Sequence, residues 1–163
     1  MAVPPANPTA REHLRENLAP FNQIRNALYQ LIRFMQDKKV SVPDDLHRMG
    51  RDIARTFSNY WLPPPGDPTQ VLREVYLDVT GSKVKVDLTG KNVRVVDKKC
   101  RLCKVKYPDI DHAGCELIVA MIAEFFVQAR AKDATSINLK LVGVEESRAR
   151  GNERCVHLYR LES

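Results

Sequence analysis

The stretch AGCELIVAMIAEFFVQARA, residues 113–131, constrains the fold most, because it is apolar on nearly every side. A helix with apolar residues around most of its circumference is typical of a protein core. Its longest apolar run, residues 117–123, is far too short to span a bilayer. We therefore expect this segment to be the central buried helix of the fold, with other elements packed around it.

Helical segments are expected before it. In residues 11–37, apolar side chains recur at steps of three and four, which predicts one buried face: Leu14, Leu18, Phe21, Leu28, Leu31 and Met35. The stretch SVPDDL predicts the start of a second helix, with Ser41 as cap and Asp44 completing a capping box. Its predicted apolar stripe continues to Trp61 and comprises Leu46, Met49, Ile53, Phe57 and Tyr60. Prolines at 63–65 end it, and Asp67 can cap a third helix.

The apolar period then changes to two. Val84, Val86 and Leu88 alternate with polar residues, TGKN predicts a turn, and the alternation returns through residues 93–95. Residues 137–141 and the segment around Val156 predict two further strands. The fold class that follows is α+β: N-terminal helices, a β-hairpin, the central buried helix and a C-terminal β-hairpin, with a small antiparallel sheet packed against helices.

A chain of 163 residues is expected to form one domain. Residues 1–10 lack the basic and apolar regions of a signal peptide and predict a disordered tail. Residues 11–163 then form a single domain, with an N-terminal helical part at 11–62 and a core at 68–163. A cytoplasmic protein is expected, in which cysteines favour metal or thiol chemistry over disulfides.

The cysteines predict a metal site. The two-residue gap between the first pair lets one turn aim two thiolates at one ion, and zinc takes four such ligands in a tetrahedron. We expect a structural zinc held by all four cysteines of the chain: Cys100, Cys103, Cys115 and Cys155. The set closes if the last strand pairs beside the first hairpin. His112 is the reserve ligand, and His157, on the same strand face as Cys155, is a weaker one.

Two alternatives stay open for the cysteines. The sequence CRLC could be a dithiol redox pair, although it does not follow a strand and open a helix as thioredoxin-type motifs do. Cys115 and Cys155 could instead be small buried apolar residues. A closed site with four protein ligands leaves no coordination position for a substrate. If the cysteines bind zinc, the ion is therefore expected to have a structural role.

The net charge of +6 is not spread evenly, because the excess of basic residues lies in the first two thirds of the chain. Its densest part is a basic patch with a single intervening acid: Arg94, Lys98, Lys99, Arg101, Lys104 and Lys106. Such a patch can attract phosphates, so nucleic-acid binding is possible but not favoured, since Tyr107 is the only aromatic residue there. A solvated surface and charge compensation for a thiolate cluster are the alternatives.

Several motifs in residues 45–163 resemble the 4-vinyl reductase (4VR) domain family, a small-molecule (hydrocarbon)-binding family related to TRAPP-type trafficking subunits. GRDIARTF at 50–57 resembles the family's glycine-containing helix, and a hairpin runs into C-x-x-C at 100–103. AGCELIVAMIAEFF at 113–126 resembles its cysteine-initiated helix, and RARGNERCVHLYRL at 148–161 its terminal strand.

The resemblance implies a zinc site that uses Cys115 and Cys155, next to a hydrophobic pocket for an apolar or aromatic ligand. Many family members have another cysteine where this chain has Ser147, and phenol-sensing members an acid where it has Val144. We therefore expect Cys100 and Cys103 to complete the site. Candidate pocket residues, each of which could equally be plain core, are Trp61, Phe57, Met121, Phe125, Phe126 and Tyr159.

Three functions follow as expectations. The first is a zinc-stabilised small-molecule-binding or sensing domain, associating as a homodimer through apolar helices. The second is a protein–protein interaction module resembling trafficking-complex subunits, which apolar exposure on the helix of residues 11–37 would favour. The third is a basic nucleic-acid-binding protein. No catalytic residues are recognised, so an enzyme is not expected.

Overall fold

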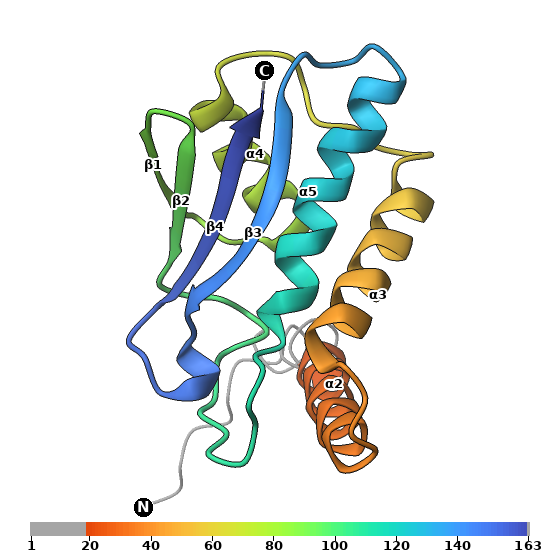
Figure 1. The fold of residues 1–163 in the computed structure, drawn as a ribbon, viewed down its shortest axis with the longest axis vertical. Helices are drawn as coiled ribbons and strands as arrows, with labels where there is room; N and C mark the ends of the chain where they lie inside the picture. The colour runs from red at the N-terminus through yellow and green to blue at the C-terminus, as the bar shows by residue number, and fades with distance from the viewer. Residues whose placement is uncertain (1–18, 163) are drawn as a thin grey trace, which may run out of the picture.

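The computed structural model describes residues 19–162 and has the expected α+β architecture (Figure 1). Its elements are α2 (Ala19–Asp37), α3 (Val42–Phe57), α4 (Pro68–Thr80), β1 (Lys85–Thr89), β2 (Asn92–Asp97), α5 (Cys115–Ala131), β3 (Asn138–Glu146), the short 3₁₀ helix η2 (Arg148–Arg150) and β4 (Cys155–Glu162). The predicted tail at 1–10 and the predicted helical residues 11–18 lie outside the described part.

The four strands form one sheet in the order β1-β2-β4-β3, with every neighbouring pair antiparallel. The last strand thus enters between the first hairpin and β3. This places Cys155 directly opposite Asp97, the last residue of β2. The sequence predicted that the cysteine site closes if the last strand pairs beside the hairpin. This pairing is confirmed.

Helix α5 is buried as predicted. Twelve of its residues are buried, from Cys115 to Ala129, and it packs between α3 on one side and the β3 side of the sheet on the other (Figure 1). Helix α4 covers the sheet from behind in this view. In the described part of the chain, no helix combines the length and the apolar character needed to cross a membrane.

Helix α3 buries a different face from the predicted one. Its buried residues are Val42, Leu46, Gly50 and Ala54, and a Cβ built on Gly50 would lie only 2.3 Å from the Leu117 carbonyl oxygen. Small residues bring α3 close to α5, and this turns the second half of the predicted stripe outward. Three of its members are exposed to solvent: Ile53 at 45%, Phe57 at 44% and Tyr60 at 86%.

Helix α2 also differs in detail from the prediction. Its buried residues are Arg25, Tyr29, Ile32 and Met35, whereas the predicted Leu28 and Leu31 are half-buried. The apolar exposure that would favour an interaction module is present on this helix, because Ile24 is 64% and Phe34 is 58% exposed.

One of the two predicted helix caps is confirmed. The Asp67 carboxylate accepts the backbone N–H groups of Thr69 and Gln70 at the start of α4. The prediction for Ser41 was wrong, because its side chain accepts no backbone N–H. Pro43 lacks one of the two N–H groups that a cap could bind, and the Ser41 hydroxyl donates instead to the Asp44 carboxylate.

Candidate metal centre

Three separate segments deliver the four cysteines. Cys100 and Cys103 lie in the turn after β2, where the buried Asp97 carboxylate accepts the Lys99 backbone N–H at 2.8 Å and fixes the turn. Cys115 is the first residue of α5, and Cys155 is the first residue of β4. The junction before α5 is tight, because a Cβ on Gly114 would meet Tyr29 Oη at 3.2 Å.

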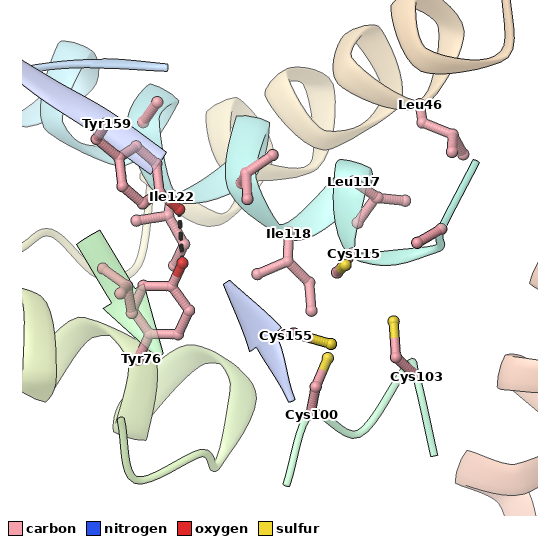
Figure 2. Close-up of a cluster of buried hydrophobic side chains, with 14 of the residues drawn as sticks. Leu46, Tyr76, Cys100, Cys103, Cys115, Leu117, Ile118, Ile122, Cys155 and Tyr159 are labelled. Atoms are coloured by element: carbon pink, nitrogen blue, oxygen red, sulfur yellow. Dashed lines mark hydrogen bonds between the residues drawn. The ribbon is translucent and has the colours of Figure 1, made fainter. Parts of the chain in front are cut away.

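The four side chains surround a common point, with their sulfur atoms turned toward one another (Figure 2). The Sγ atoms of Cys100, Cys103 and Cys155 all lie within 4.8 Å of one another. Cys155 also belongs to a second such group with Cys115 and His157. Tetrahedral zinc with Zn–S bonds of about 2.3 Å needs sulfur atoms about 3.8 Å apart. The three sulfur atoms of the first group are close enough for such a site, and Cys115 joins them through its proximity to Cys155.

All four thiols are free and at most 1% exposed. Hydrogen-bond donors reach the sulfurs from outside: the Tyr29 hydroxyl donates to Cys103 Sγ at 3.4 Å, and the Arg148 backbone N–H donates to Cys155 Sγ at 3.4 Å. Such outer contacts orient metal ligands and stabilise their anionic form. The donor set, its burial and these contacts fit a structural zinc ion.

Ser147 lies beside the same cluster. The Ser147 hydroxyl is fully buried and lies 3.8 Å from Cys115 Sγ and 3.9 Å from Cys155 Sγ, both of which donate to it. It also accepts the Ala149 backbone N–H at 3.2 Å. A cysteine at this position would lie next to Cys115 and Cys155.

The cluster favours negative charge on Cys155 and Cys103, because hydrogen bonds within it lower the pKa of both thiols. Hydrogen bonds from Cys100, Cys103 and Cys115 lower the pKa of Cys155 well below its ordinary value. The same interactions, together with burial, raise the pKa of Cys115. Thiolates stabilised by neighbouring thiols are a suitable starting point for metal binding, which requires deprotonated sulfur and releases protons.

His157, the weaker reserve ligand, lies nearer the cysteine cluster than His112, the first reserve ligand. It is fully buried, and its Nδ1 lies 2.7 Å from the Tyr76 hydroxyl. Its Nε2 has no hydrogen-bond partner among the described residues. His112 is half-buried and belongs to neither group of candidate ligands in the described part of the chain. The imidazole that a metal could use therefore lies on β4 rather than in the loop before α5.

Tyr29 contacts the cysteine cluster, and the sequence pattern did not predict this contact. The apolar pattern favours Leu28 and Leu31 instead, because a leucine stripe is the stronger apolar signal. The step of three between Tyr29 and Ile32, and the next step of three to Met35, could have placed Tyr29 on the buried face.

The structure divides the basic patch. Arg94 on β2 forms ion pairs with Glu145 at 3.0 Å and Glu146 at 3.4 Å. Lys98 and Lys99 line a hollow of about 810 Å³ together with Arg94. A second hollow, of about 400 Å³, includes Lys99, Arg101 and Lys104. Lys106 lies instead beside Gly151.

The predicted pocket residues form core contacts. Trp61 lies edge-on to Phe125, with ring centroids 5.2 Å apart, and Phe57 packs against both. The remaining three side chains are buried: Met121, Phe126 and Tyr159. The Tyr159 hydroxyl lies 2.6 Å from that of Tyr76 (Figure 2). A ligand between α3 and α5 would have to displace this aromatic packing.

Comparison with known proteins identifies the fold. No protein-family model matches the chain, and no curated protein sequence matches it. Among solved structures, it is similar to subunit 3 of a trafficking protein particle complex from Naegleria fowleri, described as covalently bound to palmitic acid. The two share 10% sequence identity with a TM-score of 0.67, over 88% of this chain and 96% of that one. The likeness establishes a shared fold with a trafficking subunit.

Proposed function

We propose that this chain is a non-catalytic interaction module that pairs with a second copy of itself, in a fold held together by a structural zinc ion. The observation that carries the proposal is an outward apolar face, formed by Ile53 and Phe57 of α3 and by Tyr60 in the turn after it. These side chains bound a shallow hollow of about 420 Å³ together with Asp52 and Thr56. Apolar side chains grouped on one helix face are typical of an interaction surface.

A second copy is the occupant that the charges favour. Asp52 and Arg55 flank the face and are ion-paired at 3.2 Å, so both signs of charge lie at its edge. In a twofold contact the same surface meets itself, and mixed charges can then pair across the interface. The fold shared with a trafficking subunit agrees with an assembly role.

Light scattering during size-exclusion chromatography tests this association. The full chain is expected to elute as a dimer, and Phe57→Asp is expected to elute as a monomer, because a carboxylate would be buried at the contact. Leu88→Asp is the matched control, since Leu88 is 40% exposed but lies on β1. A monomeric full chain at every concentration, or a dimeric Phe57→Asp, contradicts the proposal.

The zinc ion would be held by Cys100, Cys103, Cys115 and Cys155. Its role would be to join the loop after β2, the start of α5 and the start of β4, so that metal binding contributes folding free energy. The burial of the four sulfurs and the donors from Tyr29 and Arg148 support this assignment. Four protein ligands would leave no coordination position for a substrate, which supports a structural role.

A second candidate function is the binding of a small apolar molecule, as in the 4-vinyl reductase domain family. The palmitic acid bound to the trafficking subunit favours it. The ring cluster of Phe57, Trp61 and Phe125 would form one wall of such a site. Native mass spectrometry of the freshly purified chain tests this candidate: an added mass that organic extraction removes supports it, and the mass of the chain with metal alone contradicts it.

A further inference from the structure

A buried arginine on α2 lacks the partner that such a group normally has. Arg25 is 7% exposed, and its Nε has no hydrogen-bond partner among the described residues. A buried guanidinium without an acceptor is costly, because it has lost its hydration without compensation. Other arginines of the chain are paired: Arg94 with Glu145, Arg154 with Glu146 and Arg33 with Asp109.

Arg25 lines a cavity of about 400 Å³ beside the cysteine cluster, between the start of α2, the loop after β2 and η2. This volume is within the range of small-ligand sites, roughly 300–1,000 Å³. Its described lining contains no acidic residue and five basic ones, from three parts of the chain: Arg25, Lys99, Arg101, Lys104 and Arg148. Phe21, Asn22 and Cys100 complete the described lining.

The basic side chains of the cavity are not held in place by hydrogen bonds to the cysteine sulfurs of the described chain. Among the described residues, the donors to the sulfurs from outside the cluster are the Tyr29 hydroxyl and the backbone N–H of Arg148. No basic side chain of the cavity donates a hydrogen bond to sulfur within that part of the chain. The Arg101 guanidinium lies 5.8 Å from the ring centre of Phe21. The Nε atom of Arg25 therefore remains without an acceptor among the described residues.

We propose that this cavity binds the phosphate group of a phosphate monoester. A phosphate dianion offers several acceptor oxygens, which match the planar donor fork of arginine and the ammonium groups of lysine. It would supply the acceptor that Arg25 lacks and neutralise part of the excess positive charge. The phosphate can come from a soluble ester or from a lipid headgroup, and the two sources share this chemistry.

Calorimetric titration of the full chain with inorganic phosphate tests the proposal. Saturable binding is expected, and Arg25→Gln is expected to weaken it about tenfold or more, since a hydrogen bond to a charged group is lost. Lys83→Gln is the control, because Lys83 lines the hollow beside β1 and not this cavity. It is expected to change the affinity less than about twofold, because screened surface charges interact weakly.

A thermal denaturation series separates a ligand contact from a structural role. Arg25→Gln removes an uncompensated buried charge, so it is expected to retain or raise the melting temperature while losing the stabilisation by phosphate. Arg148→Gln provides an independent variant, since the Arg148 backbone N–H that reaches Cys155 is kept. Absence of saturable phosphate binding, or equal affinity in the chain and in both variants, would overturn the proposal.

Two further binding measurements distinguish the possible sources of the phosphate. Sedimentation with phosphatidylcholine vesicles that contain phosphatidate, but not with phosphatidylcholine alone, supports a lipid headgroup if Arg25→Gln abolishes it. Binding of glycerol phosphate without vesicle binding supports a soluble ester. Vesicle binding that persists in Arg25→Gln, with no binding of either soluble phosphate, overturns the proposal.

Discussion

The hydroxyl of Tyr76 on α4 lies 2.7 Å from Nδ1 of His157 on β4, in the interior of the protein. The same hydroxyl lies 2.6 Å from that of Tyr159, so Tyr76 joins two side chains of one strand. His157 in turn forms a group with Cys115 and Cys155. Hydrogen bonds thus connect helix α4 to the candidate metal centre through β4.

Replacing Tyr76 by phenylalanine is expected to destabilise the fold by about 1–3 kcal/mol, because buried polar groups on His157 and Tyr159 lose their partner. Burial raises the pKa of Tyr76 well above its ordinary value, so the hydroxyl stays protonated over the usual pH range. Urea unfolding measures the change. Tyr60→Phe is the control, since Tyr60 is 86% exposed. An equal effect of the two variants would show that the buried network does not contribute.

Gly50→Ala is expected to destabilise the chain by about 1–3 kcal/mol, which is typical of overpacking in a core. The added Cβ would lie 2.3 Å from the Leu117 carbonyl oxygen and 3.0 Å from the Met121 backbone nitrogen, so α3 and α5 would have to separate. Denaturant unfolding measures the loss.

Gly90→Ala is the comparison for this prediction, because an added Cβ there meets nothing within 4 Å. Its cost is limited to the left-handed backbone of the turn, at φ of 60°. If Gly50→Ala lowers the free energy of unfolding no more than Gly90→Ala does, the close packing of α3 against α5 is contradicted.

Arg55→Ala is expected to lower the unfolding midpoint more than Arg48→Ala. The Arg55 Nε donates at 2.9 Å to the carboxylate of Glu124, whose side chain is 6% exposed. Without Arg55, the described donor to that carboxylate is Gln128, at 2.8 Å. Arg48 pairs with Asp45 at the surface, where ion pairs contribute little. Identical midpoints for the two variants would contradict a role for the Arg55–Glu124 pair.

Much of the candidate site could be predicted from sequence, because local signals specify its parts. The two-residue gap between Cys100 and Cys103, the helix start at Cys115 and the alternation around Cys155 each place one ligand on an element. Whether the four cysteines come together depends on the order of the strands, which residue patterns alone leave open. The pairing of Asp97 with Cys155 in the sheet settled it.

The outward face of α3 could not be predicted from its apolar pattern. Periodicity identifies apolar residues on one helix face, but the side that contacts a neighbour also depends on how closely the two backbones can approach. Gly50 and Ala54 allow α5 to pack on the small-residue side, which leaves Ile53 and Phe57 exposed. The burial of Arg25 likewise depends on tertiary contacts, because a single arginine in an amphipathic helix predicts a solvated position.

The cysteine variants test the ligand assignment residue by residue. Cys155→Ser and Cys100→Ser are each expected to lower zinc content and thermal stability. Cys155 is common to both candidate ligand groups, so its loss should have the larger effect. Ser147→Ala serves as the control, since it removes a neighbour of the sulfurs and no sulfur. It is expected to retain zinc, and zinc retention in both cysteine variants would contradict the assignment.

Metal analysis of the freshly purified full chain, combined with thiol titration in the native state, tests the central claim most directly. The account predicts about one zinc ion per chain, the stoichiometry of a single four-ligand site. It also predicts that the four thiols react with a thiol reagent only after a chelator or denaturant is added. A protein without zinc, whose four thiols all react freely in the native state, would contradict the claim.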